Sequence, residues 1–204
     1  MDINTPKVIL IYARPGHGKT TFLKRLSASI RFSHLYIISA SLHDDYKESE
    51  LKKFGLPKEN IHTNHDFIYE ELCRFRSITN EDGTFATKLL ILDDVLHLNT
   101  TAGNIAREVR DIFSTQRHYT MYIIVSVQLL KALGKALRYT AHTFITGSID
   151  DESVTLMSNI TGWKKVILNN IQLMQHEFLI GSNTGGLLKM STIKKKPSTY
   201  VNRG

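Results

Sequence analysis

The chain has 204 residues, of which 42% are hydrophobic and 22% are charged. This length fits one domain with a sizeable core and excludes a large second domain, and the composition is that of a folded globular protein. No apolar run approaches the roughly 18 residues that span a bilayer, so we expect an intracellular protein without a transmembrane segment of its own. The net charge of +7 permits binding to a polyanion such as nucleic acid.

Short apolar runs rich in β-branched residues alternate with longer segments of helical periodicity. Strands are predicted at residues 7–12, 34–40, 88–92, 120–127 and 141–146. Helices are predicted at residues 19–30, 44–54, 66–78, 102–114, 129–137 and 150–159. This alternation is typical of an α/β fold with a mostly parallel sheet and helices on both faces.

The pattern changes after residue 159. The stretch QHEFLIGSNTGGLLKMSTI, residues 175–193, contains two short apolar runs around the turn SNTGG. Such a pattern predicts a C-terminal β-hairpin. Residues 194–204 contain three consecutive lysines and are expected to form a flexible basic tail.

The stretch ARPGHGKTT joins the first predicted strand to the first predicted helix. Its spacing, Ala13-x4-Gly18-Lys19-Thr20, is that of a phosphate-binding loop, or Walker A motif, with alanine in place of the first glycine. Such a loop directs successive N–H groups into one concavity at a helix N-terminus, where the helix dipole also favours an anion. We expect Lys19 to reach the β- and γ-phosphates of ATP and the Thr20 hydroxyl to ligate Mg²⁺. The predicted nucleotide-binding residues are Arg14, Pro15, Gly16, His17, Gly18, Lys19, Thr20 and Thr21.

Two acidic residues, Asp93 and Asp94, follow the third predicted strand in the stretch KLLILDDV. Because ligands bind at the carboxyl edge of an open α/β sheet, both carboxylates are expected at the binding edge, as in a Walker B motif. Asp93 is predicted to hold Mg²⁺ through water, since this ion takes few protein carboxylates. Asp94, which points differently along the strand, is predicted to polarise the attacking water. The alternative is a pair of acids that merely ends a strand.

Gln128 ends the predicted strand at residues 120–127. If this strand neighbours the one that carries the two acids, the Gln128 carboxamide can donate to the γ-phosphate and orient water. The alternative for Gln128 is an ordinary polar residue at a strand end.

Arg117 lies in the loop before the same strand, at the end away from Gln128, so it is poorly placed to serve the nucleotide of its own chain. An arginine there is a candidate for an arginine finger that reaches a neighbouring subunit's γ-phosphate. Arg138, at the end of the helix before the fifth strand, is the rival candidate. A surface or helix-capping role is the alternative for each. The predicted catalytic residues are therefore Asp94, Gln128 and Arg117.

Four stretches carry a family resemblance: ARPGHGKTT, LLILDDV, TQRHYTMYIIVSVQ and LGKALRYTAHTFI. In this order and at these distances they resemble the genome-packaging ATPases of double-stranded DNA viruses with an internal membrane, in the poxvirus-type branch of the FtsK–HerA superfamily. The resemblance covers residues 7–157, and the small size is similar to that of the packaging enzymes of archaeal turreted icosahedral viruses. The chain departs from the family in Ala13 and in its compact C-terminal region, which leaves open how DNA is gripped.

The resemblance implies a RecA-like P-loop NTPase that hydrolyses ATP with Mg²⁺ and assembles into a homo-oligomeric ring. It further implies translocation of double-stranded DNA into a preformed capsid, with viral capsid or membrane vertex proteins as partners, in the host cytoplasm or at the packaging vertex of the virion. It assigns Lys19 and Thr20 to nucleotide and metal, Asp93 to the metal, Asp94 to water activation and Gln128 to sensing the γ-phosphate.

The chain is accordingly divided into a P-loop ATPase core at residues 1–160, a hairpin extension of the same domain at 161–193, and the basic tail at 194–204. Two other functions remain open. A nucleotide-dependent switch or interaction ATPase would bind ATP and move nothing. A phosphotransferase of the nucleotide-kinase type would phosphorylate an acceptor, although a kinase more often has a mobile basic lid, and no arginine-rich lid stands out here.

Overall fold

The computed structural model describes residues 5–94, 104–147, 150–171, 173–182 and 187–191. The strands in these residues form one sheet with the order β3-β2-β4-β5-β1-β6-β7-β8. The strands are β1 (Val8–Tyr12), β2 (His34–Ser39), β3 (Ile61–Asn64), β4 (Lys88–Asp93), β5 (Met121–Val127), β6 (Thr143–Thr146), β7 (Glu177–Ser182) and β8 (Leu187–Ser191). The helices are α1 (Lys19–Ser27), α2 (Leu42–Asp45), α3 (Glu48–Leu51), α4 (Tyr69–Arg76), α5 (Asn104–Thr115), α6 (Lys135–Thr140), α7 (Asp151–Thr161) and α8 (Lys165–Asn170).

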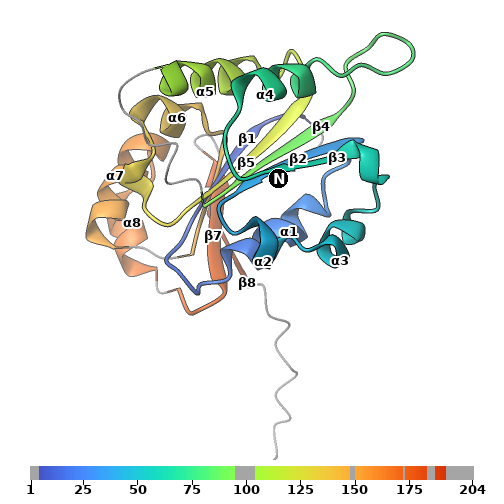
Figure 1. The fold of residues 1–204 in the computed structure, drawn as a ribbon. Helices are drawn as coiled ribbons and strands as arrows, with labels where there is room; N and C mark the ends of the chain where they lie inside the picture. The colour runs from blue at the N-terminus through green and yellow to red at the C-terminus, as the bar shows by residue number, and fades with distance from the viewer. Residues whose placement is uncertain (1–4, 95–103, 148–149, 172, 183–186, 192–204) are drawn as a thin grey trace, which may run out of the picture.

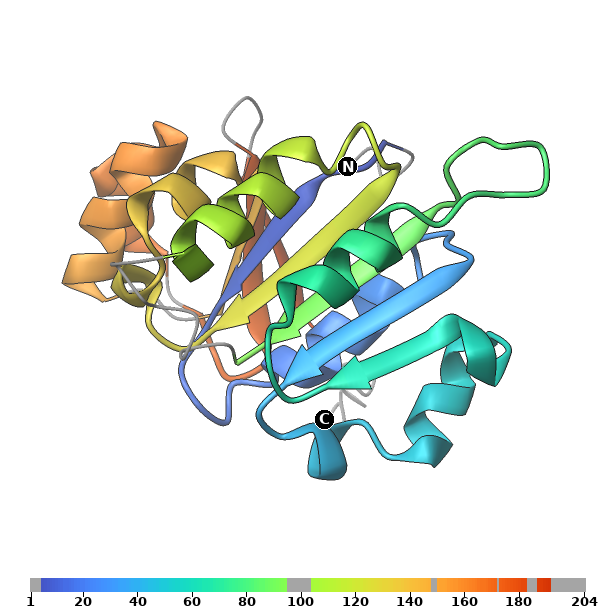
Figure 2. The ribbon, with the colours of Figure 1, turned by 45° about the horizontal axis from the view of Figure 1, so that its top comes forward.

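Strands β1 to β6 run parallel to one another, so their carboxyl ends meet at one edge of the sheet (Figure 2). Every residue of β1, β4 and β5 is buried. Continuous burial explains why these segments read as unbroken apolar runs instead of alternating ones, since helices cover both faces of a parallel sheet. The mostly parallel α/β sheet predicted from the sequence is confirmed.

Helices lie on both faces of the sheet, with α4 and α5 above it and α1 and α2 below it in the view of Figure 1. Each face has its own core. Under α4 and α5, Leu72 and Ile112 pack with Leu90 of β4. On the other face, Leu23 of α1 packs with Ile11 of β1. The alternation of side chains along each strand supplies both cores at once.

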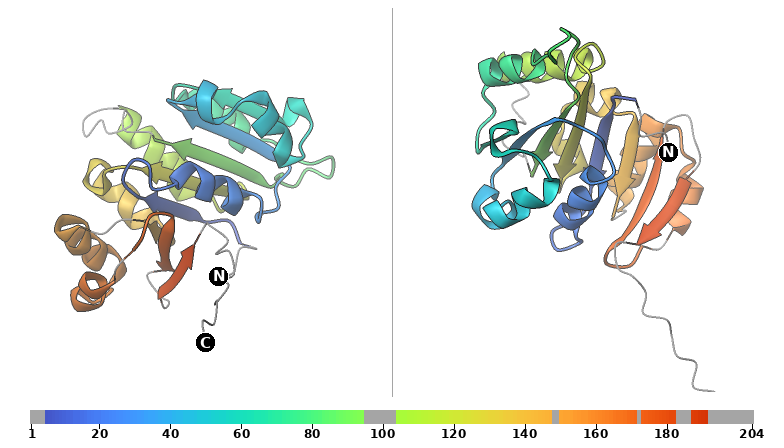
Figure 3. Two further views of the ribbon diagram at one scale, coloured as in Figure 1. Left: turned by 90° about the horizontal axis from the view of Figure 1, so that it is seen from below. Right: turned by 90° about the vertical axis from the view of Figure 1, so that its right-hand side faces the viewer.

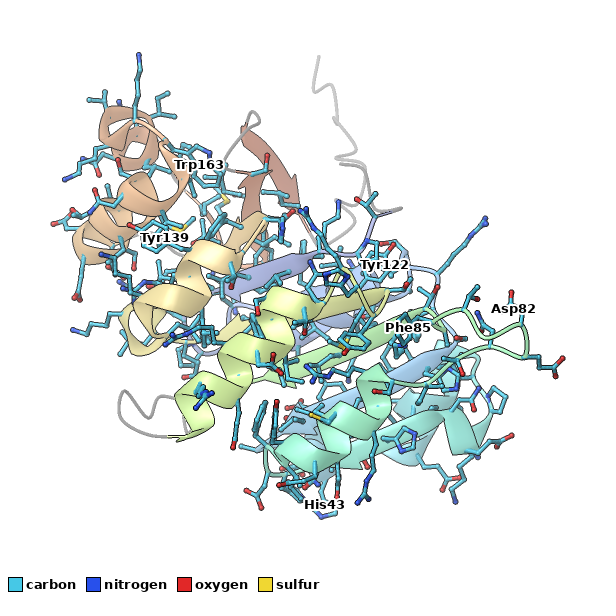
Figure 4. The ribbon with its side chains drawn as sticks, turned by 90° about the horizontal axis from the view of Figure 1, so that it is seen from above. His43, Asp82, Phe85, Tyr122, Tyr139 and Trp163 are labelled. Atoms are coloured by element: carbon cyan, nitrogen blue, oxygen red, sulfur yellow. The ribbon has the colours of Figure 1, made fainter. Side chains whose placement is uncertain are left out.

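Strands β7 and β8 extend the sheet beyond β6 and pair antiparallel, as the predicted C-terminal hairpin requires (Figure 3). Helices α7 and α8 pack beside them, and the indole Nε1 of Trp163, between these helices, donates to the carbonyl of Ser182 at 3.1 Å (Figure 4). Because β7 runs opposite to β6, β7 begins at the carboxyl edge of the sheet. The segment that enters β7 therefore lies at the same edge as the loop that follows β1.

Two predicted helices were wrong, and one strand and one helix were missed. The helix expected at 44–54 is divided into α2, α3 and a 3₁₀ turn, because the extended backbone of Lys47 interrupts it. The helix expected at 129–137 is a 3₁₀ turn followed by α6, with the break at Gly134. Strand β3 and helix α8 were not predicted; β3 is a four-residue edge strand with two exposed side chains, and α8 has six residues, so both lack a clear periodicity.

The predicted basic tail at 194–204 and most of the predicted turn SNTGG lie outside the described residues. Within the part of the chain that the structure describes, every helix is too short or too polar to cross a bilayer. The division of the chain at residue 160 stays a prediction.

Candidate nucleotide-binding site

The loop between β1 and α1 has the backbone of a phosphate-binding loop. Gly16 and Gly18 adopt positive φ angles of 72° and 92°, a region that side chains with a Cβ rarely enter. Gly18 is the N-cap of α1 and has no side chain to cap the helix, so the first N–H groups of α1 stay available to an anion. The two glycines therefore provide the concavity that the motif predicted.

Lys19 is buried, with 8% of its surface exposed, at the start of α1. Its Nζ lies 3.4 Å from the carbonyl of Arg14, and the backbone N–H of His17 points at the same carbonyl from 3.3 Å. Burial lowers the pKa of Lys19, and the nearby carboxylates of Asp94 and Asp93 oppose that shift. Two donors of the loop thus converge on the Arg14 carbonyl, and each would be released from it on binding a phosphate.

The rest of the predicted loop is accessible to solvent. Arg14 and Thr21 are exposed, as are Pro15 and Gly16. The Arg14 guanidinium lies 3.9 Å from Asp150, the N-cap residue of α7. Tyr12, the last residue of β1, donates to the same carboxylate at 2.8 Å. This contact fixes the end of β1, and hence the start of the loop, to α7.

Asp93, the last residue of β4, is 2% exposed and faces the loop. Its Oδ2 accepts hydrogen bonds from the Thr20 hydroxyl at 3.3 Å and from the Tyr46 hydroxyl at 2.9 Å. Burial raises the pKa of Asp93, while the hydrogen bonds from Tyr46 and Thr20 favour its charged form. The structure therefore brings together the hydroxyl and the carboxylate that the sequence assigned to Mg²⁺.

Asp94 directly follows Asp93 and has a strained backbone conformation, with a φ of 56°. Its N–H donates to the carbonyl of Ser126 at 3.0 Å, and its Oδ2 accepts from Nε2 of Gln128 at 2.6 Å. The expected adjacency of Gln128 and the acids is confirmed, because β4 and β5 are neighbours in the sheet. Among the described residues, the buried Oδ1 of Asp94 has no hydrogen-bond partner. A buried acceptor of this kind calls for a ligand or water in the complete site.

These oxygen donors fit Mg²⁺, which prefers hard oxygen ligands and keeps several of its own waters. The Thr20 hydroxyl and the Asp93 carboxylate lie together, and the unpartnered Oδ1 of Asp94 is available to a bound water. No cluster of three or more His, Cys, Asp or Glu side chains that could hold a metal occurs in the described residues.

The two candidate arginines differ in what they contact. Arg138 donates through Nη1 to the carbonyls of Leu130, Lys131 and Leu133, and so closes the turn before α6. Arg117 is exposed in the turn between α5 and β5, at the amino edge of the sheet and away from the acids. Arg138 thus stabilises a turn of its own chain. Arg117 lies at the end of β5 away from Gln128, which is the location from which its role as an arginine finger was predicted.

Three residues of the site, Tyr46, Tyr12 and Asp150, were not predicted from the sequence. Tyr46 falls within the helix expected at 44–54, and nothing local to it indicates that its hydroxyl reaches Asp93. The signal available for Asp150 was its place as an acidic residue directly before a helical segment, which is typical of an N-cap.

The fold and the loop define the chain as a RecA-like P-loop protein. The family model described as Poxvirus A32 protein matches residues 3–180, so the chain belongs to that family. The poxvirus-type branch that the sequence motifs resembled is thereby confirmed. Among curated protein sequences, none matches this chain.

The chain is also similar to several solved structures. One is B204, the DNA-packaging ATPase from Sulfolobus turreted icosahedral virus, with a TM-score of 0.68 and 16% identity over 94% of this chain and 100% of that one. Another is the genome packaging NTPase B204 from Sulfolobus turreted icosahedral virus 2 in complex with sulfate, with a TM-score of 0.72 and 15% identity over 95% and 100% of the two chains. The cytoplasmic domain of the Thermomonospora curvata type VII secretion ATPase EccC gives a TM-score of 0.65 at 15% identity over 96% of this chain and 25% of that one. At these identities the similarity establishes the fold, and it confirms the predicted RecA-like architecture.

Proposed function

We propose that the protein is a Mg²⁺-dependent ATPase that moves double-stranded DNA into a preformed viral capsid. The observation that carries the proposal is the convergence of Lys19, Thr20, Asp93, Asp94 and Gln128 at one edge of the sheet, in a member of the Poxvirus A32 protein family. The similar B204 protein has been solved in complex with AMPPCP and with ATP-γS and is described as a genome packaging NTPase.

In the proposed reaction, the N–H groups of the loop and the Lys19 ammonium bind the β- and γ-phosphates. The Thr20 hydroxyl and, through water, the Asp93 carboxylate would hold Mg²⁺, which would supply neutralisation of the charge on the phosphates when bound. Asp94 accepts a proton from the attacking water, and Gln128, which already donates to Asp94, orients that water against the γ-phosphate.

The proposal extends to assembly and partners. The exposed Arg117 suits an arginine finger supplied to the next subunit of a homo-oligomeric ring, because it lies at the edge opposite its own acids. The net charge of +7 favours contact with DNA phosphates. Capsid or membrane vertex proteins are the further partners that we propose, with the protein in the host cytoplasm or at the packaging vertex of the virion.

Phosphate release with and without duplex DNA tests the proposal. We expect the protein to release phosphate slowly from Mg-ATP alone and several times faster with duplex DNA, and the Lys19→Ala variant to do neither. ATP binding with no turnover under either condition would favour the nucleotide-dependent switch. Transfer of phosphate to a nucleotide acceptor, with no response to DNA, would favour the phosphotransferase.

A further inference from the structure

The phosphate-binding loop is contacted by a turn far along the chain, Met174–Glu177, that leads into β7. In Figure 1 the blue segment that follows β1 and the orange segment that enters β7 lie side by side at the lower left. Three consecutive loop residues, Gly16, His17 and Gly18, each have a contact in this turn or directly after it. These contacts do not involve Asp93 or Asp94, and the proposed reaction described above does not use them.

Gln175 holds one peptide group of the loop. Its Nε2 donates to the carbonyl of Gly16 at 3.0 Å. Because the C=O of one residue and the N–H of the next point in opposite directions across a planar peptide bond, this contact turns the N–H of His17 toward the loop interior. That N–H donates to the Arg14 carbonyl at 3.3 Å, so Gln175 and Arg14 hold the two sides of the same peptide group.

The His17 side chain is fixed by the same segment. Its Nε2 donates to the carbonyl of Glu177 at 2.9 Å, and its ring meets the edge of Phe178 with the centroids 5.2 Å apart. The ring also lies so close to Gly147 that a β-carbon there would come within 2.2 Å of His17 Cδ2. His17 therefore links the loop to the ends of β6 and β7.

His176 covers Gly18 directly. A β-carbon on Gly18 would lie 2.5 Å from Nδ1 of the His176 imidazole. Two features therefore require glycine at this position: the close approach of His176 and the positive φ of Gly18. His176 itself has a φ of 67°, an uncommon conformation for a residue with a side chain. Strained residues that persist are held by their surroundings and cluster at functional sites.

We propose that the turn Met174–Glu177 sets the shape of the phosphate-binding loop, with Gln175 and His176 as positioning residues. Phosphate binding is then coupled to the β7–β8 hairpin, and by reciprocity nucleotide binding stabilises the hairpin. This inference rests on the proposed nucleotide site, and it adds a C-terminal element that controls that site.

The test compares the binding of Mg-ATP and of Mg-tripolyphosphate to the full chain by calorimetry. If the turn shapes the phosphate loop, Gln175→Leu weakens both ligands by the same factor, on the order of 3-fold for one exposed hydrogen bond. His176→Asn keeps a residue that tolerates the positive φ, and combined with Gln175→Leu it should weaken both ligands by on the order of 10-fold. The half-saturating Mg²⁺ concentration for hydrolysis stays unchanged, because Thr20 and Asp93 are not contacted. Asn169→Leu, the same kind of change at an exposed residue of α8, is the matched control.

Amide hydrogen exchange gives a second readout on the wild-type protein, in which Mg-ATP should slow exchange in β7. Weaker binding of ATP with unaltered binding of tripolyphosphate would overturn the inference, because the turn would then contact the nucleoside. Unaltered binding of both ligands, or no change of exchange in β7, would also overturn it. A wild-type protein that binds neither ligand would instead contradict the proposed ATPase function.

Discussion

Removal of one hydroxyl, by Tyr46→Phe, should weaken both the fold and the metal side of the site. Tyr46 is 3% exposed, and its hydroxyl donates to the buried Asp93 carboxylate at 2.9 Å. A hydrogen bond to a charged group contributes about 1.5 to 3 kcal/mol, and the other donor to the same oxygen, Thr20, is at the longer distance of 3.3 Å. We therefore expect a loss of about 2 kcal/mol, which lowers the melting temperature of a chain of this size by about 4 to 8 °C.

The effect on the metal follows from the charge of Asp93. Burial already raises the pKa of Asp93, and loss of the Tyr46 donor raises it further, so the carboxylate becomes a poorer partner for Mg²⁺. Since loss of a group that orients a metal ligand commonly weakens metal affinity by about 10-fold or more, we expect the half-saturating Mg²⁺ concentration to rise by about 10-fold.

Thermal unfolding and Mg²⁺ titration of ATP hydrolysis measure the two effects. Tyr36→Phe is the matched control, because the Tyr36 hydroxyl also donates to a carboxylate, that of Glu71, away from the site. It should lower stability without altering the Mg²⁺ requirement. A Tyr46→Phe protein with lower stability and an unaltered Mg²⁺ requirement would refute the reasoning, since Tyr46 would then act on the fold alone.

Three further predictions follow from the same geometry. Asp94→Asn should still bind Mg-ATP but hydrolyse it slower by on the order of 10²-fold, whereas Asp93→Asn should also weaken Mg²⁺-dependent binding; equal binding defects would show that the two roles are wrongly divided. The pKa of Asp93 is higher in the folded chain than in the unfolded chain. The folded protein therefore loses stability as the pH rises from the unfolded-state pKa of Asp93 through its folded-state pKa. Asp93→Asn should therefore raise the melting temperature of the nucleotide-free protein at pH 7, with a gap that closes at acidic pH, and an equal or lower melting temperature at pH 7 would argue against it. Mixing Arg117→Ala with Lys19→Ala subunits should partly restore hydrolysis, since the first keeps a working loop and receives its neighbour's arginine, and absence of rescue would remove Arg117 as a finger.

The sequence predicted the parts of the site that depend on local pattern. The phosphate-binding loop, the two acids and Gln128 each stand at the end of a continuous apolar strand, and parallel strand ends meet at one edge whatever the details of packing. Their location at one edge could thus be predicted from the sequence, whereas the contact between Gln128 and Asp94 also required β4 and β5 to be neighbours in the sheet.

Tyr46 and Gln175 could not be predicted in this way. Tyr46 reaches Asp93 only because the expected helix breaks at Lys47, which frees the tyrosine to enter the core. Gln175 contacts Gly16 across a separation of 159 residues, and the contact exists only because β7 pairs antiparallel with β6 and so starts at the loop edge. Both depend on tertiary structure that periodicity does not encode.

The central claim, that ATP hydrolysis moves the protein along double-stranded DNA, is tested most directly by displacement of a third strand bound at one site on a long duplex. With Mg-ATP the wild-type protein should displace the third strand, at a rate that rises more than proportionally with protein concentration as subunits assemble. The Lys19→Ala variant should leave it bound. DNA-stimulated hydrolysis by the wild-type protein, with the third strand displaced no faster than in the absence of ATP, would contradict the claim.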